Sequence, residues 1–256
     1  MILPCNTQWQ KVTNYNCHNS INEPIYILRN HYGFEQMIFR SVKPFDSLRM
    51  HLKCDVHVGK TNPFDFGPLS PEEEREIFQS AAFYIEHGHY ITQSPYTSLA
   101  DAVVPDEWKR QENESAFDYL LRLTSTIHSA FSYESDITDV HHTAGDTINL
   151  GRGVCQDFSH VFIAIARNNR IPCRYVSGYL DQGKSFKGSL QMHAWIEAMI
   201  PGIGWMGFDP TNNILQDYHY IKVCHGVDYS ECSPIRGILK SHGEQSTSYE
   251  VKVIQQ

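Results

Sequence analysis

Three residues whose types can cleave an amide bond together stand in separate segments of the chain: Cys155, His193 and Asp209. Cys155 follows a turn with glycines at 151 and 153 and precedes an apolar run of helical character. At a helix N-terminus, unpaired backbone N–H groups and the helix dipole favour a thiolate over a thiol. The thiolate needs a base that becomes an imidazolium, and the imidazolium needs a carboxylate that orients it. These residues therefore predict catalysis by a Cys-His-Asp triad.

Each of these residues also has a purely structural interpretation. Cys155 could be a core residue at a helix start, and His193 could be an ordinary hydrogen-bonded histidine of a sheet. Asp209 precedes Pro210, and an Asp-Pro pair often opens a turn, so Asp209 is the least specific of the three. The combination favours the catalytic interpretation. Asp157 is expected to complement the helix N-terminus.

The oxyanion formed when a thiolate attacks a carbonyl needs hydrogen-bond donors. We expect the backbone N–H of Cys155 to be one donor, with Tyr133, Gln156 and Trp195 as candidates for the second. Trp195 shares a strand face with His193 by the two-residue period. It could therefore wall the site against water or simply pack in the core.

Three segments resemble motifs of the transglutaminase-like superfamily, in particular its bacterial branch of transglutaminase-like enzymes and candidate cysteine proteases. They are Gly-Arg-Gly-Val-Cys-Gln-Asp-Phe at 151–158, His-Ala-Trp-Ile-Glu at 193–197 and Gly-Phe-Asp-Pro-Thr-Asn at 207–212. The stretches 170–179 and 226–237 also fit, although Arg170 replaces the usual glycine. The resemblance covers roughly residues 70–256. It implies a papain-like core in which the nucleophile helix packs on an antiparallel sheet.

The resemblance also implies a reaction in which the thiolate attacks an amide carbonyl and forms a thioester. Water as the acyl acceptor would make the protein a cysteine peptidase or amidase, whereas a lysine amine would make it a protein-glutamine transglutaminase. We favour hydrolysis of a protein or peptide amide, because the sequence has neither an Asp-rich calcium loop nor a recognisable amine-binding feature. A non-catalytic protein-binding module is the competing class, but such a module has no use for all three residues.

Composition excludes several classes of function. The chain has 256 residues, 41% of them hydrophobic, and a formal net charge of −8. It has no Lys/Arg cluster of the kind that binds nucleic acid. The longest apolar stretch, Val161–Ala166, is too short to span a membrane, and Met1–Cys5 does not begin a signal peptide. We therefore expect no nucleic-acid partner, no membrane association and a cytoplasmic location.

Cysteine and histidine usage is consistent with a thiol enzyme that needs no cofactor. Seven irregularly spaced cysteines favour free thiols in a reducing compartment. Among the fourteen histidines, the clusters at 87–89 and 141–142 lack the spacing of a helical zinc site. We expect no metal site.

The elements that position the triad follow from hydrophobic periodicity. Strict alternation over Leu48–Val58 predicts a half-buried strand, and weaker patterns predict strands at Ile25–Leu28 and Met37–Val42. Together they predict an antiparallel β-strand region over residues 1–68. A stretch rich in Pro, Gly and Asn closes this region and separates it from a catalytic domain over residues 69–256.

Helices come first in the catalytic domain and strands second, which predicts an α+β fold. A capped helix should begin after Ser70 and run to Gly88, with its buried face at Ile77, Phe78, Ala81, Ala82 and Ile85. Two further helices are expected at Phe117–Phe131 and Val154–Ala166, the latter central because it is apolar on nearly all sides. The expected strands are Cys173–Leu180, His193–Ile200, Trp205–Phe208, His219–Val223 and Tyr249–Ile254.

The hairpin around Pro201–Gly204 provides a test of the triad. A loop of these four residues would put His193 and Asp209 on opposite faces of the sheet. A loop of three or five residues, which pairs Ile200 with Gly204 or Met199 with Trp205, puts both on one face at a diagonal distance of roughly 7–8 Å. The chemistry therefore predicts the register.

Overall fold

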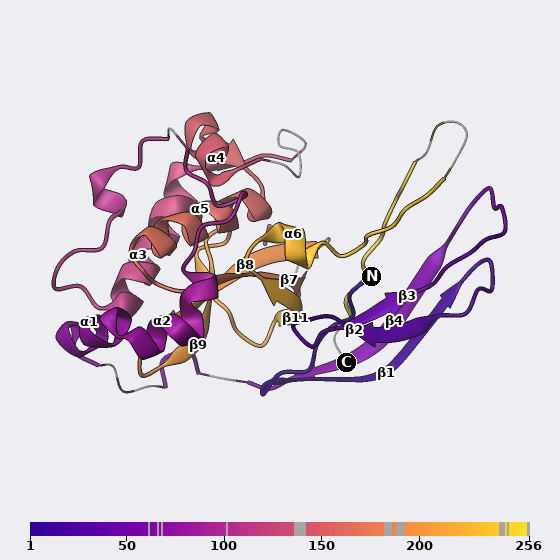
Figure 1. Cartoon of the computed structure of the whole chain (residues 1–256), viewed down its shortest axis with the longest axis horizontal. Helices are drawn as coiled ribbons and strands as arrows, with labels where there is room; N and C mark the ends of the chain where they lie inside the picture. The colour runs from indigo at the N-terminus through magenta and orange to yellow at the C-terminus, as the bar shows by residue number, and fades with distance from the viewer. Residues whose placement is uncertain are drawn as a thin grey trace.

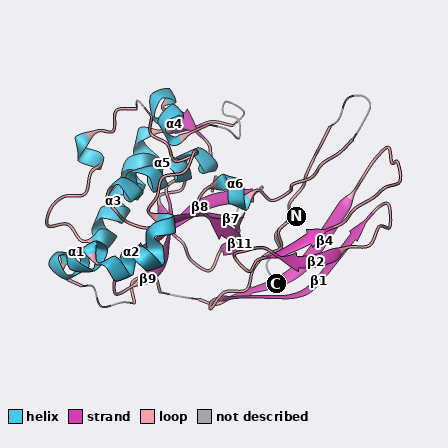
Figure 2. Cartoon of the chain, in the orientation of Figure 1, coloured by secondary structure: helices cyan, strands magenta, loops and turns pink. Residues whose placement is uncertain are grey.

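Helix α5 (Cys155–Asn168) forms the centre of the larger hydrophobic core, and every residue from 157 to 167 is buried. The computed structural model describes residues 1–60, 62–65, 67, 69–100, 102–135, 142–181, 186–187, 192–240, 244 and 246–254. Among these, the helices gather on one side of an antiparallel sheet, and a second group of strands lies at the far end (Figures 1 and 2). Because α5 packs on this sheet, the expected α+β fold is confirmed.

The central sheet has the strand order β10-β9-β8-β7-β11, with every neighbouring pair antiparallel. The strands are β7 (Cys173–Leu180), β8 (Met192–Ile200), β9 (Gly204–Asp209), β10 (Ile214–Leu215) and β11 (Tyr220–Gly226). Ala194, Ile196 and Ala198 of β8 belong to the hydrophobic core around α5. The alternate residues His193 and Trp195 point to the opposite face of β8.

The strand expected at Tyr249–Ile254 is not formed, and that prediction is wrong. Val251 and Val253 are half-buried, whereas Tyr249 and Ile254 are each 66% exposed, so the apolar alternation is present without a neighbouring backbone to pair with. Alternation predicts an extended conformation, but a strand also needs a ladder of hydrogen bonds.

The first helical segment is two helices where one was expected: α1 (Pro71–Gln79) and α2 (Ala81–His87), followed by the 3-10 turn η1 (Gly88–Tyr90). The predicted capping box at Ser70 is confirmed, since its hydroxyl accepts from the Glu73 N–H and Glu73 accepts from the Ser70 N–H. Ser80 breaks the helix because its backbone is extended and its hydroxyl caps α2. The break turns Phe83 inward and leaves Ile85 83% exposed.

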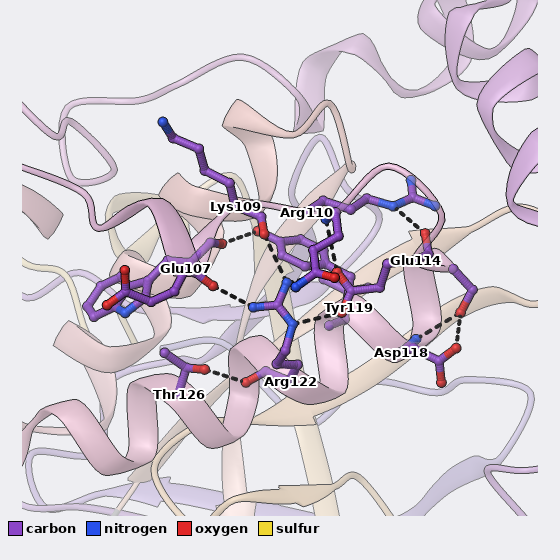
Figure 3. A network of polar contacts seen from close by, with 12 residues as sticks. Glu107, Lys109, Arg110, Glu114, Asp118, Tyr119, Arg122 and Thr126 are labelled. Carbon is purple, nitrogen blue, oxygen red and sulfur yellow. Dashed lines mark hydrogen bonds and ion pairs between the residues drawn. The ribbon is translucent and has the colours of Figure 1, made fainter.

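Helix α3 (Ala116–Ala130) confirms the second expected helix, and its N-terminal half is tied to the preceding segment by polar contacts (Figure 3). Arg122 donates to the carboxylate of Glu114 and to two backbone carbonyls of the segment that contains the 3-10 turn η2 (Asp106–Trp108). The buried Tyr119 hydroxyl donates to the Trp108 carbonyl at 2.9 Å. These bonds fix α3 against the segment that precedes it.

The N-terminal strands form two separate antiparallel pairs. In one, β1 (Gln10–Asn19) pairs with β4 (Met50–Val58), whose alternation of half-buried and exposed residues confirms the predicted strand. In the other, β2 (Tyr26–Arg29) pairs with β3 (Glu35–Ile38). Sequence analysis missed β1, which is mostly polar and interrupted by a bulge where Asn14 has a φ of 50°.

The N-terminal segment joins the central sheet at its β11 edge. Cys5 N–H donates to the Lys222 carbonyl at 3.2 Å, and the buried Gln10 amide both donates to that carbonyl (2.7 Å) and accepts from the Lys222 N–H (2.8 Å). Ile2, Cys5 and Phe34 belong to the same hydrophobic core as α5. The N-terminal segment is therefore anchored on the central sheet.

Candidate active site

Cys155 is the first residue of α5, and the turn before it is shaped by glycines. The short helix α4 (Ala144–Leu150) ends at Gly151, whose φ of 71° is costly for residues with a side chain. The strands β5 (Ser132–Tyr133) and β6 (Arg152–Gly153) then form a short parallel pair. A Cβ at Gly153 would lie 2.7 Å from that of Asp157, so only glycine lets the chain approach the helix so closely.

Asp157 caps this helix as the sequence predicted. Its buried carboxylate accepts from the Val154 N–H through Oδ2 at 2.8 Å. A carboxylate in the first turn also opposes the positive end of the helix dipole. The N–H of Cys155 itself belongs to the first turn, where backbone donors have no acceptor within the helix. The nucleophile candidate therefore lies at a fixed and electropositive helix end.

His193 and Asp209 lie on one face of the sheet because the connecting loop has three residues. Ile200 pairs with Gly204 and Met199 with Trp205, and both pairs belong to the single register that the chemistry required. The register prediction is confirmed. His193 Nε2 lies 2.7 Å from Asp209 Oδ2, and both side chains are fully buried.

Five donors surround the Asp209 carboxylate. Oδ1 accepts from the N–H groups of Thr211 (2.9 Å) and Asn212 (3.2 Å). Oδ2 accepts from His193, from the Asn212 side-chain amide at 2.9 Å and from the Tyr220 hydroxyl at 2.7 Å. Burial alone would raise the pKa of Asp209, but the charge of His193 and these hydrogen bonds outweigh it and lower the pKa. Asp209 is therefore held ionised.

The electrostatics favour the imidazolium form of His193. Burial lowers the pKa of His193, but the charge and hydrogen bond of Asp209, with a smaller contribution from Cys155, raise it to about 10. Nδ1, the nitrogen not bonded to Asp209, is buried and has no aligned hydrogen-bond partner among the described residues. Nδ1 is thus left to the neighbouring Cys155 thiol. The structure brings together all three predicted residues.

Trp195 forms a wall beside His193. Its ring stacks on the imidazole with a centroid distance of 6.3 Å and an interplanar angle of 22°, and it is fully buried. Gly178, the cross-strand partner of His193, makes room for this ring, since a Cβ there would lie 2.6 Å from the Trp195 Cη2 atom. The indole N–H donates to Gln216 Oε1 at 3.0 Å. Trp195 is therefore unsuited to be the second oxyanion donor.

The hydroxyl of Tyr133 is a hydrogen-bond donor near the Cys155 thiol. Burial and the charge of Cys155 raise the pKa of Tyr133 to about 12, so its hydroxyl stays protonated at neutral pH. The residue ends β5, next to the turn that leads into α5. Tyr133 and Gln156 remain the candidates for the second oxyanion donor.

The site opens into a broad cleft. Its lining includes Cys155, His193, Tyr179 and Met192, together with residues of the strand β4. Among the described residues, no group of three or more His, Cys, Asp or Glu side chains could hold a metal ion; His141 lies outside them. No helix in the described part of the chain is long and apolar enough to cross a membrane.

Sequence reasoning missed three residues that support the triad. Asn212 donates twice to Asp209 and lies in a motif segment that had been noted for Asp209 alone. Tyr220, on β11, donates a hydrogen bond to Asp209. Gln216, in the segment before β11, accepts a hydrogen bond from Trp195. Their spacing relative to the triad carries no local signal, because only the folded sheet brings them together.

Comparisons with known proteins agree with this geometry. A sequence model of the Transglutaminase-like superfamily matches residues 104–210, a span that includes all three site residues. The uncharacterized protein ML0607 of Mycobacterium leprae is 31% identical over 221 residues, which are 83% of this chain and 77% of that protein. The uncharacterized protein Rv2569c of Mycobacterium tuberculosis is 37% identical over 138 residues, which are 50% of this chain but only 44% of that protein.

Among solved structures, a candidate cysteine protease from Cytophaga hutchinsonii matches with a TM-score of 0.69 and 21% sequence identity. The match covers 90% of this chain and 75% of the other, so the fold is shared over most of the length of both chains. The family model, the mycobacterial relative and the shared fold lead to one conclusion: the chain belongs to the transglutaminase-like superfamily.

Proposed function

We propose that this protein is a thiol-dependent enzyme that acts on protein or peptide amides through a thioester on Cys155, with water as the acyl acceptor. It would then be a cysteine peptidase or amidase. The observation that carries the proposal is the buried His193–Asp209 pair, whose second ring nitrogen is left to a thiol at the N-terminus of α5. This is the arrangement that nucleophilic catalysis requires.

The proposed cycle begins with the imidazolium of His193 beside the thiolate of Cys155. Sγ adds to the amide carbonyl carbon, and the backbone N–H of Cys155 with a second donor stabilises the oxyanion. His193 gives its proton to the leaving nitrogen, the C–N bond breaks, and the thioester remains. Water then loses a proton to His193 and attacks the thioester, which releases the acid and restores the thiolate–imidazolium pair. Asp209 orients the ring throughout.

The identity of the acyl acceptor can be tested by measuring how the thioester divides between reaction with water and reaction with an added amine. Casein or a glutamine-containing peptide serves as acyl donor, with increasing dansylcadaverine as an amine acceptor. We expect ammonia release or chain cleavage at a rate that does not depend on the amine, because the site admits water. Amine incorporation that outpaces hydrolysis would instead establish a transglutaminase.

The same assay separates an enzyme from a binding module. Cys155→Ala is the matched control, since it removes only the sulfur from a half-exposed residue. Turnover by the native protein that this variant lacks supports the proposal. No turnover of any amide, together with an unreactive Cys155, would assign the chain to the class of binding modules.

A further inference from the structure

The buried phenol of Tyr220 shares one oxygen of Asp209 with the candidate catalytic histidine. Its hydroxyl donates to Asp209 Oδ2 at 2.7 Å, the same distance at which His193 Nε2 contacts that oxygen. Tyr220 is only 1% exposed. It reaches Asp209 from β11, across the two strands that separate β11 from β9. This contact joins the β11 edge of the sheet to the triad.

The position of the Tyr220 ring is fixed by packing. The ring meets Trp195 edge to face at a centroid distance of 5.1 Å, and the two rings form a small hydrophobic cluster with Val176 and Leu180. Trp195 is in turn held by Gln216. Because the ring is held by this packing, the Tyr220 hydroxyl is directed at a single acceptor, as is expected of a preorganised hydrogen-bond donor.

We infer that Tyr220 is a positioning residue of the triad, which acts through Asp209 by keeping the carboxylate ionised and its Oδ2 atom directed at His193. The inference deepens the proposed function and rests on it for its catalytic meaning. A hydrogen bond to a carboxylate favours the charged form. Burial and the charge of Asp209 raise the pKa of Tyr220, so the phenol remains a donor.

Other ionisable groups lie around Tyr220, Asp209 and His193, and Tyr220→Phe leaves their side chains chemically unchanged. They are His193 on β8, Cys155 on α5, Tyr133 on β5 and Asp217 ahead of β11. The effect of the hydroxyl can therefore be measured against a constant background.

The test is the pH dependence of Cys155 alkylation by iodoacetamide in the full chain, which needs no amide substrate. A reactive thiolate depends on the His193 imidazolium, and the imidazolium depends on ionised Asp209. Tyr220→Phe keeps the ring but removes the donor, so the acid limb of the rate profile should move to higher pH by about half a unit to one unit. On that limb alkylation becomes about three- to tenfold slower, and the plateau changes little.

Two comparisons separate this role from a merely structural one. Tyr119→Phe removes another buried tyrosine hydroxyl, which donates to the Trp108 carbonyl and not to a triad residue (Figure 3), and it should leave the limb in place. In an Asp209→Asn background, Tyr220→Phe should no longer move the limb, because the carboxylate is gone. Site-specific 3-fluorotyrosine at position 220, a stronger donor of nearly the same size, should move the limb to lower pH and serves if Tyr220→Phe does not fold.

An unmoved limb in Tyr220→Phe, or an equal shift in the Asp209→Asn background, would overturn the inference. Failure of the proposed amide reaction would show differently, as a normal alkylation profile without turnover of any amide.

Discussion

His193 Nε2 and Asp209 Oδ2 meet at 2.7 Å in a fully buried pair that only one phase of the β8–β9 hairpin allows. The three-residue loop sets that phase, and the glycine at 204, with a φ of 95°, lets the strand begin directly after the turn. The contact that orients His193 for proton transfer therefore depends on the backbone register of this hairpin. A one-residue slip would place the two side chains on opposite faces.

The triad residues should act as one unit. Cys155→Ala and His193→Ala are each expected to lower amide turnover by about 10³-fold or more, and the double variant should be no worse. Asp209→Asn should retain about a hundredfold more activity than Cys155→Ala, because it loses orientation and not bond-making. Turnover assays on purified variants test this, with Cys17→Ala as a control that keeps native activity. Free-energy losses that add in the double variant would contradict a shared step.

Cys155 should be the fastest of the seven cysteines to react with iodoacetamide, and should do so well below pH 8. Burial raises the pKa of the Cys5 thiol to about 11 and that of Cys173 to about 12, so these compete poorly. Mass mapping after a short exposure at pH 6 gives the order of labelling. His193→Gln should slow Cys155 selectively; labelling of Cys17 ahead of Cys155 would oppose a catalytic role.

Much of this site follows from sequence. The motif residues predicted the helix start at Cys155 and the phase that pairs His193 with Asp209, because glycine spacing and a two-residue period are local signals. Tyr220 could not be predicted, since its contact with Asp209 depends on strand order. The same limit explains the missed strand β1 and the wrong strand at Tyr249–Ile254, where pairing partners and not propensity decide the outcome.

The folding stability should depend on pH through His193. Because the folded-state pKa of His193 is raised to about 10, above the ordinary value of 6.5, its stabilising contribution is fully present below about pH 6.5 and is lost as the pH rises toward 10. Urea unfolding at pH 6 and pH 9 measures this. Between pH 6 and pH 9, the free energy of unfolding of the native protein should fall by at least about 1.4 kcal/mol more than that of His193→Gln. This difference is the equivalent of one pKa unit. Equal losses would show that His193 is not held as an imidazolium.

Gly178 should tolerate no side chain. A Cβ there would collide with the Ile221 carbonyl and lie 2.6 Å from Trp195 Cη2, so Gly178→Ala must displace the wall beside His193. We expect a loss of about 2 kcal/mol in the free energy of unfolding and slower alkylation of Cys155. Gly237→Ala is the matched control, because a Cβ at that glycine has nothing within 4 Å. Similar behaviour of the two variants would refute the packing argument.

The central claim, that Cys155 attacks an amide carbonyl and carries the acyl group, is tested most directly by trapping the thioester. The protein is mixed with a peptide library, quenched in acid and digested, and the acylated peptides are identified by mass spectrometry. The account predicts a hydroxylamine-sensitive acyl group on the peptide containing Cys155, absent in Cys155→Ala and accumulating more slowly in Asp209→Asn. An acyl group on another residue, or none while amide substrate is being turned over, would contradict it.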